Sequence, residues 1–171
     1  MAISFKPLAE SDLATLTEWL QRPHVVERWD SRPSLEDVRA TYLPCIADSS
    51  KVAPFLAYVE DLPVGYIQSY VAMGSGDGWW PDEQDPGVRG IDLFLADSDR
   101  LGQGIGTAII GEFVRRLFTD PGVTSIQADP APENGRAIRS YEKAGFTRVG
   151  VISTPDGPAL LMTVERPDGQ A

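Results

Sequence analysis

A glycine-rich turn between an expected strand and an expected helix constrains this chain most. Apolar residues alternate along 88–95, which predicts a half-buried strand. From Ile105 to Leu117 apolar residues recur every four positions, as on one stripe of a helix. Residues 101–107 lie between them and contain three glycines, which permit a tight turn and a close approach of a ligand to the backbone. The helix N-terminus favours an anion, so we expect either a phosphate site or simply a tight turn.

The spacing in this turn excludes two common phosphate motifs. A dinucleotide fingerprint would need a glycine at position 107, which is Thr, and a P-loop would need a Lys that is absent here. The turn resembles the acetyl-CoA pyrophosphate loop of the GCN5-related N-acetyltransferases, whose pattern is Arg or Gln, two residues, Gly, one residue, Gly or Ala. Gly104 and Gly106 match this pattern, whereas Leu101 departs from its first position. We therefore expect backbone N–H groups, and not a side chain at 101, to hold the phosphate.

Length and composition favour one ordinary globular domain. The chain has 171 residues, of which 42% are hydrophobic and 23% charged, and we expect a single domain over 1–171 with a polar tail from about 166 to 171. No apolar run suggests a signal peptide or a membrane span, so a cytoplasmic location is expected. One cysteine, Cys45, and one histidine, His24, exclude a disulfide framework and argue against a metal site. Cys45 is expected to be a small core residue and not a nucleophile.

The charge of the chain points to a cationic ligand. The net charge is −10, which disfavours nucleic acid and anionic membranes as partners. Seven acidic residues and one basic residue lie between positions 77 and 99. Such a cluster concentrates cations, although an acidic surface also simply promotes solubility.

The remaining pattern predicts a mixed α/β fold with one central sheet and about four flanking helices. Strands are expected at 3–7, 52–59, 64–71, 88–95, 125–129, 147–152 and 159–164. Helices are expected after caps at Ser11 or Asp12, at Ser34, at the glycine turn and at Asn134. Residues 24–30, after Pro23, are expected to be irregular, and residues 60–63 to form a short hairpin connection.

A second motif makes the resemblance more specific. Asn134 opens a helix, Tyr141 follows seven residues later, and Gly145-Phe146 leads into a strand, which is similar to the later acetyltransferase motif. Four blocks, at 74–80, 85–92, 141–146 and 154–158, are similar to the bacterial aminoglycoside 6′-N-acetyltransferases, and the N-terminal third matches more loosely. The resemblance implies a mostly antiparallel sheet that is splayed at the acetyl-CoA site. It also implies acetyl transfer to the 6′-amine of aminoglycosides in a ternary complex, which confers antibiotic resistance.

The resemblance places acetyl-CoA on the central strand, the glycine turn and the later helix. The residues concerned are Leu93, Phe94, Leu95, Leu101, Gly102, Gln103, Gly104, Ile105, Gly106, Thr107, Asn134, Ala137 and Tyr141. The backbone N–H near Leu93 would stabilise the oxyanion. Tyr141 would protonate the leaving thiolate; without the family, a core tyrosine would be the simpler interpretation.

Asp92 is the candidate for handling the amine. It alternates with Ile91 and Leu93, so its side chain leaves the face that those two residues share. A carboxylate on a central strand is unfavourable without a partner or a purpose. We expect Asp92 to bind the ammonium and to accept its proton directly or through water; a structural hydrogen bond to backbone is the alternative.

The substrate residues are expected to come from several loops. The resemblance implies that Trp29, and Trp79 or Trp80, pack on sugar rings. An adjacent tryptophan pair in a loop is unusual, and the alternative is that these residues cover the core. The resemblance also makes Asp77, Asp129 and Asp156 substrate contacts, although Asp is equally common in turns. The expected substrate-binding set is Trp29, Asp77, Trp79, Trp80, Asp92, Asp129 and Asp156.

Two other functions remain open on the residues alone. One is N-acetylation of a different cationic amine, such as a polyamine, a protein N-terminus or a siderophore precursor. The other is a non-catalytic protein that binds cationic ligands or acetyl-CoA. We expect acetyl-CoA as co-substrate without a metal, a small cationic aminocyclitol as partner, and a monomer or weak homodimer.

Overall fold

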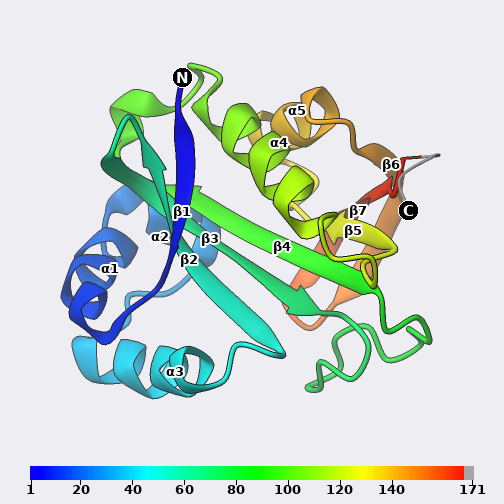
Figure 1. Cartoon of the computed structure of the whole chain (residues 1–171), viewed down its shortest axis with the longest axis horizontal. Coiled ribbons are helices and arrows are strands. Elements are labelled where there is room, and N and C mark those ends of the chain that lie inside the picture. Colours follow the sequence, from blue (N-terminus) through cyan, green and yellow to red (C-terminus); the bar gives the residue numbers. More distant parts are fainter. Residues whose placement is uncertain (168–171) are drawn as a thin grey trace. The chain divides into compact units, whose positions relative to one another are not determined.

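The computed structural model describes residues 1–167 and contains the expected mixed α/β architecture (Figure 1). Its strands are β1 (Ile3–Pro7), β2 (Val52–Val59), β3 (Leu62–Val71), β4 (Val88–Leu95), β5 (Ser125–Ala128), β6 (Thr147–Thr154) and β7 (Gly157–Glu165). Its α-helices are α1 (Leu13–Leu20), α2 (Pro23–Trp29), α3 (Leu35–Ala47), α4 (Ile105–Leu117) and α5 (Gly135–Lys143). Two 3₁₀ helices, Glu10–Asp12 and Ser98–Arg100, complete the regular structure of the described part.

The strands form one seven-stranded sheet in the order β1-β2-β3-β4-β5-β7-β6. The pairs β1–β2, β5–β7 and β6–β7 are antiparallel, whereas β4 and β5 pair in parallel at Val88–Gly90 with Ser125–Gln127. The chain divides into two compact units, a first unit of Met1–Ser69 with Asp92–Leu101 and a second unit of Tyr70–Ile91 with Gly102–Ala171. Strands β3 and β4 therefore each contribute residues to both units.

The first unit has its own apolar core under helices α1 and α3. Leu13, Leu16 and Leu20 on α1 are buried, as expected from their helical spacing. Helix α3 begins with the expected capping box, in which Ser34 Oγ accepts from the Asp37 N–H and the Asp37 carboxylate accepts from the Ser34 N–H.

Helix α2 is a difference from the sequence prediction. Residues 24–30 were expected to be irregular, but Pro23–Trp29 form a helix that raises the number of α-helices from about four to five. Pro23 occupies the first turn, where its fixed φ suits a helix and its missing N–H is not needed. Pro23 therefore begins α2, and it also separates α2 from α1.

The hairpins are tighter than expected. Glu60 and Asp61 have φ values of 50° and 67°, so a two-residue turn joins β2 to β3 and Leu62 already belongs to β3. At the other hairpin Thr154 pairs with Gly157, which extends β6 and β7 beyond 152 and before 159.

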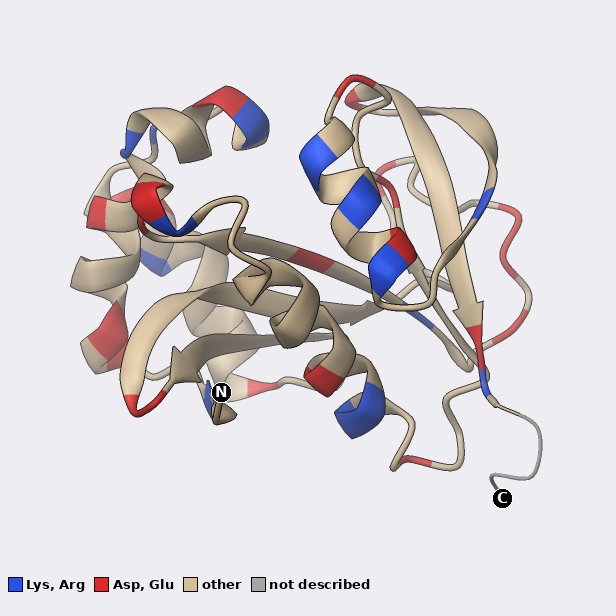
Figure 2. Ribbon diagram, turned by 90° about the horizontal axis from the view of Figure 1, so that it is seen from above, with Lys and Arg blue, Asp and Glu red and all other residues tan. Residues whose placement is uncertain are grey.

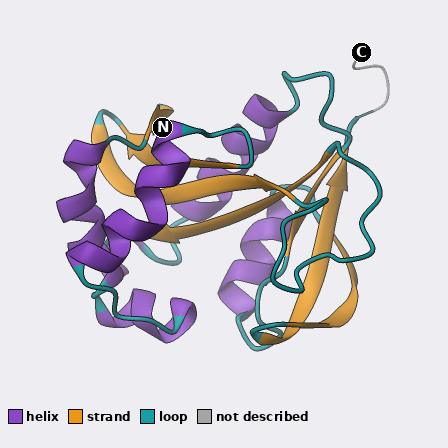
Figure 3. Ribbon diagram, turned by 90° about the horizontal axis from the view of Figure 1, so that it is seen from below, coloured by secondary structure: helices purple, strands orange, loops and turns teal. Residues whose placement is uncertain are grey.

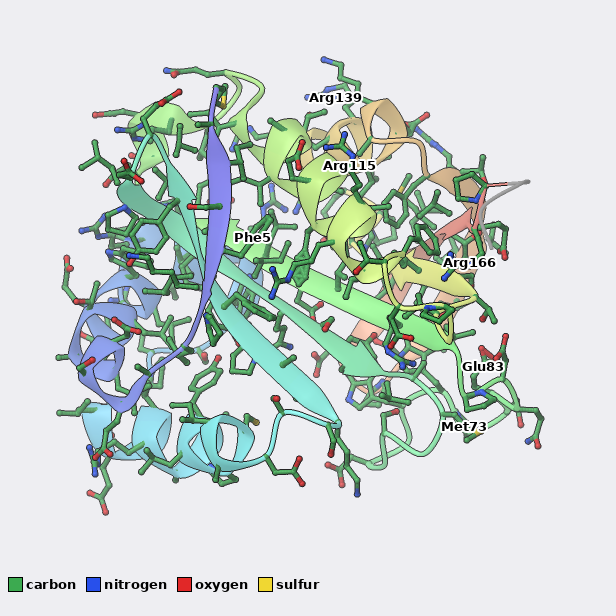
Figure 4. The ribbon with its side chains drawn as sticks, viewed as in Figure 1. Phe5, Met73, Glu83, Arg115, Arg139 and Arg166 are labelled. Atoms are coloured by element: carbon green, nitrogen blue, oxygen red, sulfur yellow. The ribbon has the colours of Figure 1, made fainter. Side chains whose placement is uncertain are left out.

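The second unit packs α4 and α5 together, and its interior includes Ile109, Phe113, Ile126 and Met162. Residues 72–87 connect β3 to β4 as a long irregular loop (Figure 3). Arg166 follows β7 and donates hydrogen bonds to the carbonyl oxygens of Phe118, Asp120 and Val123 (Figure 4). The rest of the expected polar tail, 168–171, lies outside the described residues. Within 1–167, none of the helices has the length and apolar character that a membrane span requires.

Candidate active site

A chain of side-chain hydrogen bonds holds Asp92 in the first unit. Gln68 Nε2 donates to Asp92 Oδ2 at 3.0 Å, and the Tyr66 hydroxyl donates to Gln68 Oε1 at 2.6 Å. Tyr66 and Gln68 are two residues apart on β3 and so share one face of the strand. Because Tyr66 occupies the amide oxygen, the amide N–H₂ of Gln68 is turned toward the carboxylate. Asp92, which is half-buried, therefore has a fixed orientation.

Tyr66 is suited to be a permanent donor in this chain. Only 1% of the residue is exposed, and burial raises its pKa well above the usual value of 10, with a further contribution from the neighbouring Tyr42. Burial also raises the pKa of Tyr42. Both hydroxyls consequently stay protonated at any pH at which an enzyme would work.

Trp29 lies in an aromatic cluster of the first unit. Its ring is edge-on to Phe94 and to Tyr66, with ring centres 5.1 and 6.0 Å away, and Phe94 stacks on Tyr66 at 5.6 Å. Trp29 is half-buried, so part of the ring stays accessible. The expected packing of Trp29 on a sugar ring stays a prediction, and the cluster gives this residue a structural role as well.

The end of β4 that was expected to bind the thioester is held firmly. Gly65 permits a close approach of β3, because a Cβ there would lie 2.4 Å from the carbonyl oxygen of Phe94. His24 Nε2 hydrogen-bonds with the carbonyl oxygen of Leu95 at 2.8 Å. Phe94 and Leu95 are buried, and Leu93 is half-buried. The oxyanion role of the Leu93 N–H stays a prediction.

The glycine turn has the geometry of an anion cradle. Gly102 and Gly104 have φ values of +75° and +81°, and a Cβ at either position would meet nothing within 4 Å. Gly104 is the N-cap of α4 and is exposed together with Gln103. The first N–H groups of a helix lack acceptors within the helix, so those of Ile105 and the next two residues point toward the open side. Leu101 is half-buried and has no polar side-chain atom to offer.

The second motif of the sequence has a clear structural role. Asn134 caps α5, and its side-chain oxygen accepts from the Ala137 N–H at 3.4 Å. Tyr141 is only 6% exposed, and its ring is edge-on to Phe146 with centres 5.2 Å apart. The role of Tyr141 as an acid stays a prediction, since this packing also suits a core tyrosine.

The two adjacent tryptophans are fixed by the loop between β3 and β4. Trp80 Nε1 donates to the Tyr70 hydroxyl at 2.9 Å. Gly90 on β4 makes room for that tyrosine, because a Cβ there would lie 2.0 Å from Cζ of Tyr70. Asp77 and the following glycine have φ values of 55° and 83°, and this turn folds the chain back so that Gly76 bridges to Trp79. Both tryptophans are half-buried.

These tryptophans line a pocket of about 350 Å³ that lies wholly within the second unit. The other lining residues come from the same loop, from β5, and from the β6–β7 hairpin: Gly78, Pro81, Asp82, Glu83, Gln127, Ile152, Ser153, Thr154, Pro155 and Leu161. Two of these residues are acidic and none is basic. One of the two acidic lining residues, Glu83, lies in the loop between β3 and β4 (Figure 4). Acidic residues also lie in other loops of the chain (Figure 2). The pocket thus combines apolar walls with negative charge.

The three predicted loop aspartates lie near the pocket in the sequence, but none of them lines it. Asp77 precedes the lining residue Gly78, and Asp156 follows the lining residue Pro155. A Cβ on Gly78 would lie 3.6 Å from Cγ of Pro155, so the two loops meet. Asp77 and Asp156 are exposed, whereas Asp129, just after β5, is half-buried. Their contacts with substrate stay predictions.

Sequence reasoning missed several residues of both units. It did not single out Tyr66 or Gln68, and it counted Asp82 and Glu83 only as members of the acidic run. The polar Gln127 in an otherwise buried strand was a signal that was not used. Which of these side chains come together depends on which strands are neighbours. A single sequence does not reveal that pairing.

The structure also describes the surroundings of Cys45 and the grouping of possible metal ligands. Cys45 is half-buried rather than part of the core, and burial raises the pKa of its thiol, so the thiolate is disfavoured. Among residues 1–167, no three His, Cys, Asp or Glu side chains are grouped to hold a metal ion.

Comparison with known proteins assigns the family. The acetyltransferase (GNAT) domain family matches residues 9–154, and the chain belongs to this family. It is 52% identical over 168 residues to aminoglycoside N(6′)-acetyltransferase type 1 of Klebsiella pneumoniae, covering 96% of this chain and 84% of the relative. It is also 58% identical over 88 residues to the kanamycin resistance protein of Rhizobium radiobacter, covering 52% of this chain and 82% of the relative.

Solved structures agree with this assignment. The crystal structure of the aminoglycoside acetyltransferase AAC(6′)-Ib in complex with coenzyme A and kanamycin has a TM-score of 0.92 and 53% identity, and the match covers 96% of this chain and 95% of that one. A spermidine N-acetyltransferase from Vibrio cholerae has a TM-score of 0.76 at 15% identity, over 95% of each chain, and shares the fold. The predicted fold and family are therefore confirmed.

Proposed function

We propose that this chain transfers the acetyl group of acetyl-CoA to the 6′-amine of aminoglycoside antibiotics and thereby confers resistance to them. The observation that carries the proposal is the acidic, tryptophan-lined pocket in a chain of this family. Aminoglycosides combine ring faces with several ammonium groups, and the pocket offers indole faces together with carboxylates. The relative from Klebsiella pneumoniae carries this activity in its name, and the solved complex of AAC(6′)-Ib contains coenzyme A and kanamycin.

The proposed reaction is a direct attack in a ternary complex. The amine nitrogen attacks the thioester carbon, the C–S bond breaks, and an amide and free coenzyme A result. The amine must lose a proton, and the leaving sulfur must gain one. Cys45 and His24 are not needed, since no enzyme-bound acyl intermediate forms.

Asp92 is proposed to bind the ammonium and to accept its proton. Its carboxylate accepts a hydrogen bond from the Gln68 amide, which supports a defined orientation of the group toward the substrate. The Leu93 N–H would stabilise the oxyanion, an effect of the kind that is worth about 3 kcal/mol. Tyr141 would donate the proton to the departing thiolate.

The glycine turn is proposed to hold the pyrophosphate of acetyl-CoA. Exposed backbone at Gly102 and Gly104 and the N-terminus of α4 provide N–H donors and partial positive charge. Trp79 and Trp80 would contact sugar rings, and Asp77, Asp129 and Asp156 would contact ammonium groups. A single acetyltransferase domain, a cytoplasmic location and a monomer or weak homodimer complete the proposal.

The direct test measures thiol release from acetyl-CoA by the purified protein with a panel of amines. The panel contains kanamycin, a linear polyamine, a lysine-type amine and a peptide N-terminus. We expect the highest kcat/KM with kanamycin. Release only with a different amine would keep the acetyltransferase and reject the substrate, and binding of acetyl-CoA without release with any amine would reject the activity.

A further inference from the structure

The pocket of the second unit contains a buried amide that neither the proposed chemistry nor the packing uses. Gln127 lies on β5 and is only 6% exposed, and it lines the pocket. Its Nε2 atom is buried and has no hydrogen-bond partner among residues 1–167. A buried N–H donor without a partner destabilises a folded protein, because the group has lost its hydrogen bonds to water. A glutamine at this position therefore calls for an explanation.

The register of the sheet accounts for where Gln127 points. Gln127 is paired with Thr163 on β7 and with Gly90 on β4, and paired residues project from the same face. Leu161 is two residues from Thr163 and also lines the pocket, so this face forms the pocket floor. The neighbouring Ile126 projects from the opposite face and is fully buried. The amide thus lies on the ligand side of the strand.

The other polar side chains that line the pocket differ from this amide in the hydrogen bonds that they can offer a ligand. The indole N–H of Trp80 already donates to the Tyr70 hydroxyl, so Trp80 offers a ligand mainly its ring face. The carboxylates of Asp82 and Glu83 attract ammonium groups and act as hydrogen-bond acceptors. The Thr154 hydroxyl already donates to the Gly157 carbonyl oxygen, Ser153 is exposed, and Trp79 is half-buried. Gln127 is consequently the lining side chain that offers a fully buried donor without a partner among residues 1–167.

Resting on the proposed function, we propose that Gln127 donates a hydrogen bond to an oxygen atom of the bound amino sugar, a hydroxyl or a ring ether. This contact selects oxygen-bearing amines over linear polyamines. A polyamine satisfies the carboxylates equally well, but a protonated amine donates and has no lone pair to accept the Gln127 N–H. Specificity for sugars thus resides in a neutral donor, while the acidic residues provide attraction for any cation.

The test uses two substitutions of Gln127 and a matched control. Gln127→Met keeps length and removes the amide, whereas Gln127→Glu keeps acceptor oxygens and removes the N–H donor. Gln84→Met is the control, since Gln84 is an exposed glutamine of the same unit. Calorimetric titration with kanamycin and with spermine measures the Kd of the folded protein. The binding stoichiometry from the same titration reports what fraction of the protein is folded, so a partly unfolded variant does not distort the Kd.

We expect Gln127→Met to weaken kanamycin binding about tenfold, the usual worth of one well-placed hydrogen bond. Gln127→Glu adds a carboxylate that attracts both cations but removes the donor that only kanamycin uses, so the ratio of the kanamycin Kd to the spermine Kd should rise. Spermine affinity should stay the same in Gln127→Met, and the melting temperature should stay the same or rise, since an unpaired amide is removed. The acetyl-CoA KM should not change in either variant.

Three results would overturn the inference. These are a wild-type kanamycin Kd in Gln127→Met, an equal loss for kanamycin and spermine in that variant, or an unchanged ratio of the kanamycin Kd to the spermine Kd in Gln127→Glu. A wild-type protein that binds kanamycin but never releases thiol would instead contradict the proposed function, and the titrations would still decide the role of Gln127.

Discussion

Gln68 donates a hydrogen bond from Nε2 to Oδ2 of Asp92 over 3.0 Å, from one strand to the next. Tyr66 fixes the direction of this contact, because its hydroxyl donates to the amide oxygen of Gln68. Asp92 is therefore oriented, at least through Oδ2, by the amide of Gln68. That arrangement suits a carboxylate that must capture an ammonium group and then receive its proton.

Gln68→Leu should lower kcat/KM for the amine about tenfold, because the carboxylate loses its orientation. The acetyl-CoA KM should be unchanged, and the pH profile of kcat/KM should shift, since an N–H donor stabilises a carboxylate. Gln21→Leu is the matched control, a surface glutamine of the same unit that donates to the Pro33 carbonyl. Gln68→Leu with the same activity and pH profile as Gln21→Leu would show that the contact is only structural.

Asp92→Asn should lower kcat/KM at least about 100-fold, which is the usual contribution of general acid–base catalysis. Asparagine keeps the shape and still accepts from Gln68, so the fold should be preserved. Steady-state kinetics and a melting curve check this. Turnover close to that of the wild type would remove Asp92 from proton transfer.

Tyr141→Phe should lower kcat and leave the melting temperature nearly the same, because the ring contact with Phe146 remains. The expected reason is the loss of a proton donor for the thiolate. Phe146→Leu disturbs the same contact without touching the hydroxyl and serves as the control. Full kcat in Tyr141→Phe would leave this tyrosine with a packing role alone.

Gly104→Ala should destabilise the protein by about 1 kcal/mol and raise the acetyl-CoA KM. The φ of Gly104 is +81°, which alanine adopts unfavourably, and the new Cβ would project into the open space of the turn. Gly111→Ala in the interior of α4 is the control and should be neutral or stabilising by up to about 1 kcal/mol. If both variants had the same acetyl-CoA KM, the turn would not hold the cofactor.

The contribution of Asp85 to the stability of the folded protein should depend on pH. Thr124 Oγ1 donates to Asp85 Oδ2 at 2.6 Å and the Gly87 N–H to Oδ1, and together they lower the pKa of Asp85 below its ordinary value of 3.8. A lowered pKa contributes stability above the unfolded pKa and loses it as the pH falls through the folded pKa.

Thr124→Val should therefore lower the melting temperature at pH 7, and the difference from the wild type should shrink below about pH 4. Thr119→Val is the control, because Thr119 donates to the carbonyl oxygen of Arg116, which does not titrate. A difference for Thr124→Val that is as independent of pH as the control would contradict the assignment.

The sequence predicted correctly those helix ends that depend on residues only a few positions apart. Ser34 and Asp37 lie three residues apart and form the expected capping box, and Asn134 caps α5 as expected. Helix α2 was missed because Pro23 was read only as a stop, although a proline also suits a first helical turn. Pro23 is therefore compatible with the end of one helix and with the beginning of the next. Val25, which follows it in α2, is buried and anchors this second helix in the core.

The contacts that define the site are not local, and the sequence did not predict them. Gln68 and Asp92 are separated by 24 positions, and their hydrogen bond depends on the register between two strands. Gln127 reaches the pocket floor only because β5 pairs with both β4 and β7. The strand pattern and the family resemblance predicted Asp92 and the tryptophans as site residues, whereas the side chains that contact them became visible only in the folded structure.

The proposed reaction is acetyl transfer to the 6′-amine of an aminoglycoside. The most direct measurement is thiol release from acetyl-CoA by the purified protein with kanamycin, against an aminoglycoside that has a hydroxyl group instead of an amine at the 6′ carbon. We predict rapid release with kanamycin and only background release with the hydroxyl analogue. Equal release with both would contradict the 6′ assignment, and release with neither would contradict the proposed function itself.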